Sequence, residues 1–185
     1  MRTLAAILIS VALLAPVAAR AADPGPAKGD VPVSGAVATL CVGGSVTGGD
    51  SSFNLGLLID TATGFMLPNL AAPPKTVTGS FCNTRSTIAV SATPMIAQSS
   101  SGTPPAGFTN ALDYTATASG WTPTAASYVT DAPSNPAAAQ SRTSAYSGPI
   151  TVAVSNFAPV GGAALRLVAD AAYQGTVTVT LSVAS

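Results

Sequence analysis

A two-residue alternation near the C-terminus constrains the fold of this chain more than any other feature. Over residues 176–183, apolar Val and Leu alternate with Thr and Ser without interruption. Successive side chains of a β-strand point to opposite faces, so this pattern indicates a strand with one packed face and one wet face. Shorter alternating runs at residues 31–41, 53–59 and 150–155 indicate further strands of the same kind.

Thr, Val, Ser, Gly and Pro dominate the composition, and strong helix formers other than Ala and Leu are scarce. Several short strands separated by Gly, Pro and Asn predict an all-β fold, an antiparallel sandwich in a single domain over residues 23–185. Residues 98–148 are rich in Pro, Ser and Thr, and they predict long polar loops with a short edge strand near Thr109–Ser119. A change of buried parity after Phe81 predicts a bulge or turn near Cys82-Asn83.

The N-terminus has the pattern of a secretory signal peptide over residues 1–22. Arg2 precedes an apolar run over residues 4–17, and small residues around Ala19-Arg20-Ala21 offer a cleavage site. We therefore expect an exported chain that passes through a periplasm. The run is shorter than the roughly 20 residues of a membrane span, so no span is expected in the mature chain; a short N-terminal membrane anchor is the alternative.

Two cysteines, Cys41 and Cys82, stand in this exported chain. Compartments beyond the inner membrane are oxidising, so the pair is interpreted as a disulfide. Closing a loop of this length contributes about 4 kcal/mol on the chain-entropy estimate. Two free buried thiols are the alternative. A zinc site is disfavoured, because two sulfurs without His or Glu leave the metal short of ligands.

The charged residues exclude several classes of function. The chain has no His and no Glu, with seven Asp and seven Lys or Arg. No basic cluster is present to release counterions from a nucleic acid, so no nucleic-acid partner is expected. A serine nucleophile needs an adjacent base, which a chain without His does not supply in the usual form. The sequence therefore predicts a protein that is not an enzyme and uses no cofactor or metal.

Three short motifs are similar to parts of known sites, and each is better explained as a turn. Gly49-Asp50-Ser51-Ser52 is similar to a serine-esterase motif but lacks its base. Residues 57–62 are similar to the entry of an aspartic protease, but no second copy supplies the other carboxylate. The glycine pairs at residues 43–44 and 48–49 lack the stacked array of calcium-binding repeats.

Aromatic residues remain as candidate surface contacts. A ligand-binding aromatic surface would use Tyr114, Trp121, Tyr128 and Tyr146. Ordinary packing in the core or against loops is the alternative interpretation of the same residues.

The run VPVSGAVATLCVGGSVTGG at residues 31–49 is similar to the mature N-terminus of spore coat protein U-like subunits, the pilins of Csu-type archaic chaperone–usher fimbriae. In that family an alternating strand leads to a Cys and a glycine-containing turn. Residues 52–56, 79–82 and 173–181 resemble its Phe-Gly strand, its second Cys and its Thr/Val-rich final strand.

The resemblance implies an immunoglobulin-like sandwich that lacks its final strand, which leaves a hydrophobic groove open. A periplasmic chaperone would fill the groove, and a usher would direct its replacement by the N-terminal strand of a neighbouring copy or related subunit, a form of β-strand addition. In this chain the donor-like strand spans about residues 31–40. The donor side chains would be Val31, Val33 and Val37, with Pro32 on the opposite face.

The function implied is a structural subunit of a surface fimbria or coat that polymerises by donor-strand exchange, at the cell surface or outside the cell. The alternative is a self-contained secreted β-sandwich, an adhesin or envelope binding module that uses the loops of residues 98–148. The two differ in whether the isolated chain completes its own fold.

Overall fold

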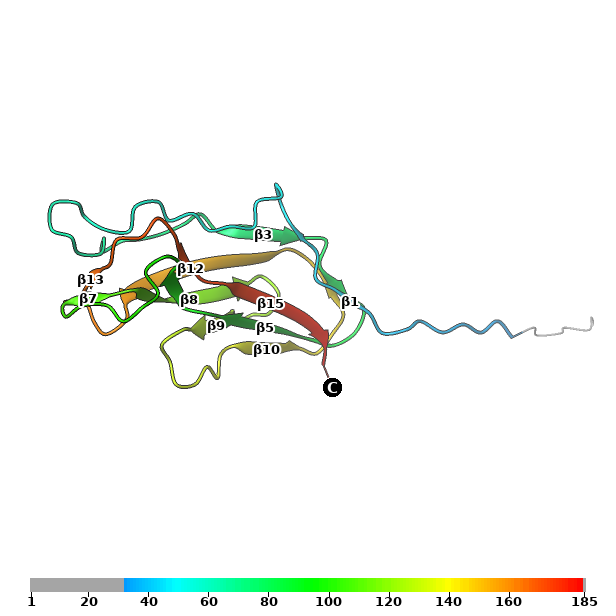
Figure 1. Ribbon diagram of the computed structural model, residues 1–185. Coiled ribbons are helices and arrows are strands. Elements are labelled where there is room, and N and C mark those ends of the chain that lie inside the picture. Colours follow the sequence, from blue (N-terminus) through cyan, green and yellow to red (C-terminus); the bar gives the residue numbers. More distant parts are fainter. Residues whose placement is uncertain (1–31, 185) are drawn as a thin grey trace, which may run out of the picture. The chain divides into compact units, whose positions relative to one another are not determined.

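The computed structural model describes residues 32–184, and these residues contain no helix. The chain divides into two units, Met1–Ala36 and Val37–Ser185. Within the first unit, residues 32–36 form no strand, while the second unit is an all-β sandwich (Figure 1). The prediction of an all-β sandwich is confirmed. The predicted signal peptide and Val31 lie outside the described residues.

The larger sheet is built on two long antiparallel strands, β8 (Ala111–Ser119) and β12 (Ile150–Pro159). Every second residue of β8 is buried, which is the alternation that a strand packed on one face produces. The sheet order is β14-β6-β8-β12-β3-β2, with β9 paired to β8. The shorter strands are β2 (Ser45–Val46), β3 (Lys75–Thr78), β6 (Met95–Ala97), β9 (Ala126–Val129) and β14 (Tyr173–Gln174).

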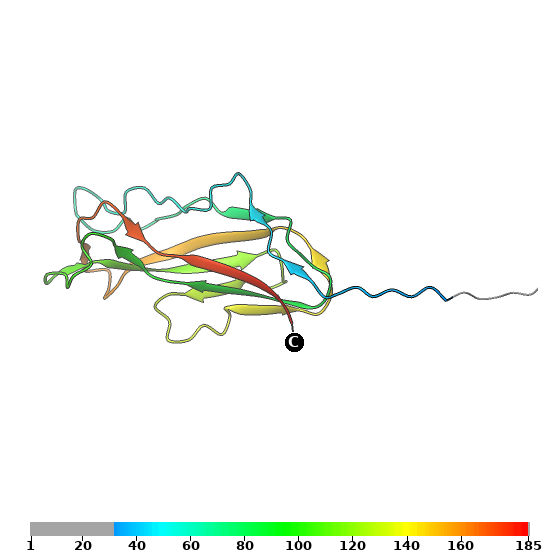
Figure 2. The same ribbon diagram turned by 45° about the vertical axis from the view of Figure 1, so that its right-hand side comes forward.

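The second sheet has three strands, and β5 (Ser86–Ala92) lies at its centre. On one edge β5 pairs with β10 (Ala139–Arg142), and on the other with β15 (Val177–Val183), antiparallel in both cases. The alternating C-terminal run identified in the sequence is therefore a strand, as predicted, and it lies at the edge of its sheet (Figures 1 and 2).

Two small sheets close the opposite ends of the sandwich unit (Figure 1). At the root end, β4 (Phe81–Cys82) lies between β1 (Cys41–Val42) and β11 (Tyr146–Ser147). At the tip end, β7 (Phe108–Thr109) and β13 (Arg166–Leu167) form a parallel pair. We use "root" and "tip" for these two ends below.

The core lies between the two sheets and has Trp121 at its root end. The indole is fully buried, and its Nε1 donates a hydrogen bond of 3.1 Å to the hydroxyl of Ser86. The ring of Tyr146 meets the indole edge-on, with centroids 5.0 Å apart. Ile88 from β5 and Ile150 from β12 are buried in the same cluster. A buried indole with its N–H satisfied supplies a large apolar area at no polar cost.

Several expectations about the strands are wrong in detail. The described residues 32–40 and 53–58 form no strand, although their alternation predicts one, and residues 98–148 contain β7 to β11 as well as loops. Thr109–Ser119 does not form an edge strand, because β8 is paired along one edge by β12 and along the other by β6 and β9. The chain does bend at Asn83-Thr84, but the buried parity changes earlier, at Gly79 (φ 79°), so that Ser80 and Cys82 are both buried. A glycine reaches this positive φ without a Cβ penalty.

Candidate strand-binding groove

The free edge of β15 is the centre of the candidate site. β15 pairs with β5 from Val177 to Val183, and no described residue forms a ladder with its other edge. An edge strand exposes a row of main-chain N–H and C=O groups and is a ready template for a further strand.

The register shows which residues present those groups. The N–H of Thr93 donates to the carbonyl of Thr176, and the N–H of Ala184 donates to the carbonyl of Arg85. In an antiparallel ladder, alternate residues direct both main-chain groups to the same neighbour. The even-numbered residues of β15 therefore bond to β5, and the odd-numbered residues direct their N–H and C=O to the free edge.

The same odd-numbered residues carry the inward side chains. Val177, Val179 and Leu181 pack against the core but are only half-buried, whereas the Thr and Ser residues between them are exposed. A strand laid along this edge would thus meet open hydrogen-bonding groups and uncovered apolar side chains at the same positions.

Residues 51–59 form the wall that faces residues 167–177, the last of which begins β15, across the opening. They run without a ladder partner until Ile59, which bridges to Met66. Phe53 and Leu55 are half-buried against the core, whereas Leu57 is 61% exposed. These residues alternate as a strand does, and they line the opening instead of joining a sheet.

The opening itself consists of two adjoining cavities of about 720 and 750 Å³. The first lies between Phe53 and Leu55 on one side and residues 173–177 on the other. The second continues toward the tip, between residues 52–59 and residues 167–174. These cavities reach β15 only at its first residue, Val177, and we call them, with the free edge that continues from Val177 to Val183, the β15 groove.

A bulge in β12 builds the floor of the groove. The pairing with β8 shifts between Ser155 and Ala158, and Asn156 has a φ of 54°. The extra residue turns Phe157 inward although its parity differs from that of the buried Val154. Phe157 stacks on Tyr114 with centroids 5.6 Å apart. The Tyr114 hydroxyl donates a 3.3 Å hydrogen bond to the Thr176 carbonyl, and burial raises its pKa.

Carboxylates anchor both sides of the groove. Asp50 accepts a 2.8 Å hydrogen bond from the Lys75 ammonium and two further bonds from Ser52, and these bonds hold the pKa of Asp50 well below its usual range. Asp170 accepts the N–H groups of Ala172, Ser99 and Ser100, and these bonds lower its pKa although desolvation opposes them. The first anchor fixes the start of residues 51–59, and the second ties residues 168–173 to the loop after β6.

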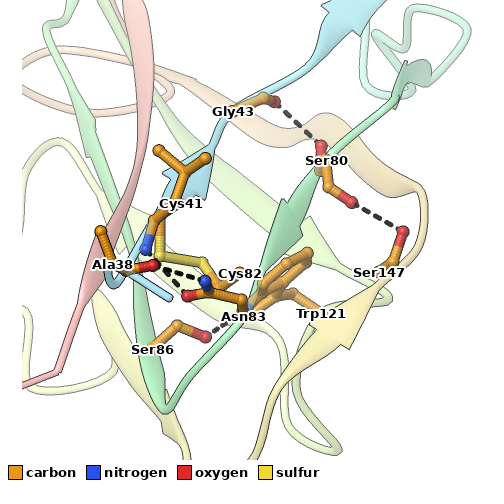
Figure 3. Close-up of a disulfide and its surroundings, with 10 residues drawn as sticks. Ala38, Cys41, Gly43, Ser80, Cys82, Asn83, Ser86, Trp121 and Ser147 are labelled. Carbon is orange, nitrogen blue, oxygen red and sulfur yellow. Dashed lines mark hydrogen bonds between the residues drawn. A yellow bond between two sulfur atoms is a disulfide. The ribbon is translucent and has the colours of Figure 1, made fainter. Parts of the chain in front are cut away.

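The disulfide lies in the small sheet at the root end of the sandwich unit (Figure 3). Cys41 and Cys82 are bonded, as predicted, and they face each other directly in the ladder of β1 and β4. The side chain of Asn83 accepts the N–H of Leu40 at 2.8 Å and donates to the carbonyl of Ala38 at 2.7 Å. The chain is therefore attached to the sandwich from Ala38 onward.

The predicted site residues differ in exposure. Val33 is 96% and Val37 is 88% exposed, while Val31 lies outside the described residues. Trp121 and Tyr114 are buried, so they are excluded from an exposed contact surface. Tyr128 and Tyr146 are half-buried and pack against the core. Core packing, the alternative considered for these aromatics, describes all four.

Of the motifs interpreted as turns, those at residues 48–52 and 57–64 contain turns, whereas Gly43-Gly44 is an unassigned link between β1 and β2. Ser52 donates its N–H and hydroxyl to Asp50, and the N–H of Gly64 donates to the carbonyl of Asp60 at 2.7 Å. Within residues 32–184 no group of three or more His, Cys, Asp or Glu is placed to hold a metal ion. No helix in the same range is long and apolar enough to cross a membrane. No protein-family model, curated protein or solved structure matches the chain.

Proposed function

We propose that this protein is a structural subunit that polymerises by donor-strand exchange, in which residues near 31–37 of one copy fill the β15 groove of another. The observation that carries the proposal is the coincidence at β15 of free main-chain groups and half-covered apolar side chains on the same odd-numbered residues. β-strand addition needs both, because main-chain bonds give affinity and alternate side chains give specificity.

The N-terminal segment has the complementary pattern. Val33 and Val37 are almost fully exposed apolar residues of one parity, and Val31 shares that parity in the sequence. Exposed valines at alternate positions are what a donor strand carries before it inserts. In the groove they would cover Val177, Val179 and Leu181, which the sandwich unit leaves half-exposed.

Pro32 selects the direction of insertion, because it has no N–H to donate. In an antiparallel pairing, donor residues with inward side chains direct their main-chain groups to β15. Pro32 lies on the outward face, so the position where an N–H would be points toward residues 51–59. The lack of that N–H therefore removes no hydrogen bond to β15. In a parallel pairing, the donor residues with outward side chains bond to β15 instead. Pro32 is then one of them, and it leaves one carbonyl of β15 without a partner.

The antiparallel direction requires a second copy. The side chain of Asn83 bonds to Ala38 and Leu40. Arg85 follows Asn83 by two residues, and its carbonyl accepts the N–H of Ala184 at the C-terminal end of β15. A chain that folded its own residues 31–37 into its own groove would have to enter from that end and run parallel to β15. A neighbouring copy has no such restriction. Exchange between copies therefore satisfies the main-chain groups better than self-insertion.

The test is assembly of the chain from Asp23 onward. Strand-exchanged polymers should appear as ladders on unheated detergent gels, and deletion of residues 23–34 should abolish the ladders. A full chain from Asp23 that stays monomeric and unfolds reversibly would contradict strand exchange and favour a self-contained secreted domain. The proposed periplasmic chaperone and usher would be sought by co-purification with the chain in which residues 23–34 are deleted, whose groove stays open.

A further inference from the structure

Exposed apolar side chains stand at both ends of the β15 groove. At the root, Leu40 is 50% exposed and bonds to Asn83. The nearby Arg85 bonds to Ala184 at the end of β15, where Val183 is 42% exposed. At the tip, Leu57 is 61% exposed on the rim of the cavity that residues 167–174 close from the other side. Singly exposed apolar side chains are ordinary on a protein surface, so the inference rests on the positions of these residues at the two ends of the groove.

The attachment of the chain at Ala38 limits how far apart two joined copies can lie. A donor strand that is antiparallel to β15 and also fills the two cavities runs from the Val183 end past Val177 and leaves the groove at the far end of the second cavity, beside Leu57. The residue after Val37 is already held by Asn83 of the donating copy. From Val37 to Leu40 the chain spans at most about 10 Å. The root of the donating copy must therefore lie against the tip of the accepting copy.

We propose that this second contact is a specific interface between copies, in which Leu40 of the donating copy packs against Leu57 of the accepting copy. The inference rests on the proposed strand exchange. The donor strand holds the copies together, and the root-to-tip contact fixes the angle between them. Because Leu40 is bonded to Asn83 next to the Cys41–Cys82 disulfide, one side of the interface is rigid. Leu57 lies between residues fixed at Asp50 and at the Ile59–Met66 bridge.

The first experiment is proximity crosslinking in polymers of the full chain from Asp23. Chains with Leu40→Cys are mixed with chains with Leu57→Cys, assembled and treated with a short bis-maleimide. The expected product is a covalent dimer of one chain of each kind. The matched control pairs Leu40→Cys with Val160→Cys, because Val160 is exposed but lines neither cavity of the groove. Equal yields from the two pairs would overturn the interface.

The second experiment measures fibre shape by electron microscopy. Leu40→Ser and Leu57→Ser should each leave the detergent-resistant ladder intact but broaden the distribution of angles between successive subunits. The double variant should broaden it no further than either single variant, since both remove the same contact. An intact ladder with unchanged angles, or with additive effects, would overturn the interface alone. Absence of any ladder from the unaltered chain would overturn strand exchange and this interface with it.

Discussion

The parity of the donor segment can be tested by exchanging two neighbouring residues. The double variant Val33→Ser/Ser34→Val keeps the length, the composition and the charge of the chain. It moves one apolar side chain from the face that would enter the groove to the opposite face. Hydrophobicity as such is unchanged, so only a mechanism that depends on alternation predicts an effect.

The size of the effect follows from the exposure of Val33. Its side chain is 96% exposed, so insertion into the groove removes nearly all of it from water. Full burial of a valine contributes about 1.5–3 kcal/mol. A serine hydroxyl buried there without a partner costs about 1–3 kcal/mol. A net loss of about 3 kcal/mol per joint corresponds to separation that is about 100-fold faster at equal association rate.

The assay follows preformed polymers of each chain at one fixed guanidinium concentration and scores the loss of the ladder over time on unheated gels. Ser34→Thr is the matched control, because it enlarges the outward residue without moving an apolar side chain, and its rate should equal that of the unaltered chain. If the exchanged variant also separated at the unaltered rate, Val33 would not be an inward residue of the donor strand.

Three further predictions concern the sandwich itself. Replacing Cys41 and Cys82 by Ser should lower the free energy of unfolding by about 4 kcal/mol on the chain-entropy estimate, measured by denaturant unfolding of the chain lacking residues 23–34; a loss below about 1 kcal/mol would contradict it. Asn156→Val should lower the free energy of unfolding by about 1–2 kcal/mol, because a β-branched residue is strained at a φ of 54°. Asn156→Gly should leave it nearly unchanged, and equal losses in the two variants would contradict strain at this bulge. With no His in the chain, stability should change little between pH 5 and 8. Hydrogen bonding lowers the pKa of Asp170 in the folded state, so its contribution to the free energy of unfolding is full above the ordinary carboxyl pKa and is lost as the pH falls below about 4. The free energy of unfolding of Asp170→Asn should therefore differ most from that of the unaltered chain above pH 5.

The sequence predicts the edge strand better than it predicts the strand at the centre. Over residues 177–183 the inward residues are Val and Leu and the outward ones Thr and Ser, so polarity alone identifies the faces. In β8 the buried residues include Ala116 and Ala118, which alternate with Thr. Alanine and threonine differ too little in polarity to show that this strand is paired on both edges and buried on one face.

The groove was only partly predictable for a different reason. Its donor residues are contiguous in the sequence, but its walls and floor come from residues 51–59, 167–177 and the β12 bulge, which only tertiary folding brings together. The alternation of Phe53, Leu55 and Leu57 predicted a strand. Whether that strand finds a partner depends on the chain that lies beside it, and the sequence pattern carries no such information.

Amide hydrogen exchange along β15 tests the open edge most directly. In the monomer of the chain from Asp23, the N–H groups of Thr178 and Thr180 should be protected by their bonds to β5, while those of Val179 and Leu181 should exchange rapidly. In the polymer, both sets should be protected. Slow exchange at Val179 and Leu181 already in the monomer would show that the edge is occupied within one chain and would contradict strand exchange between copies.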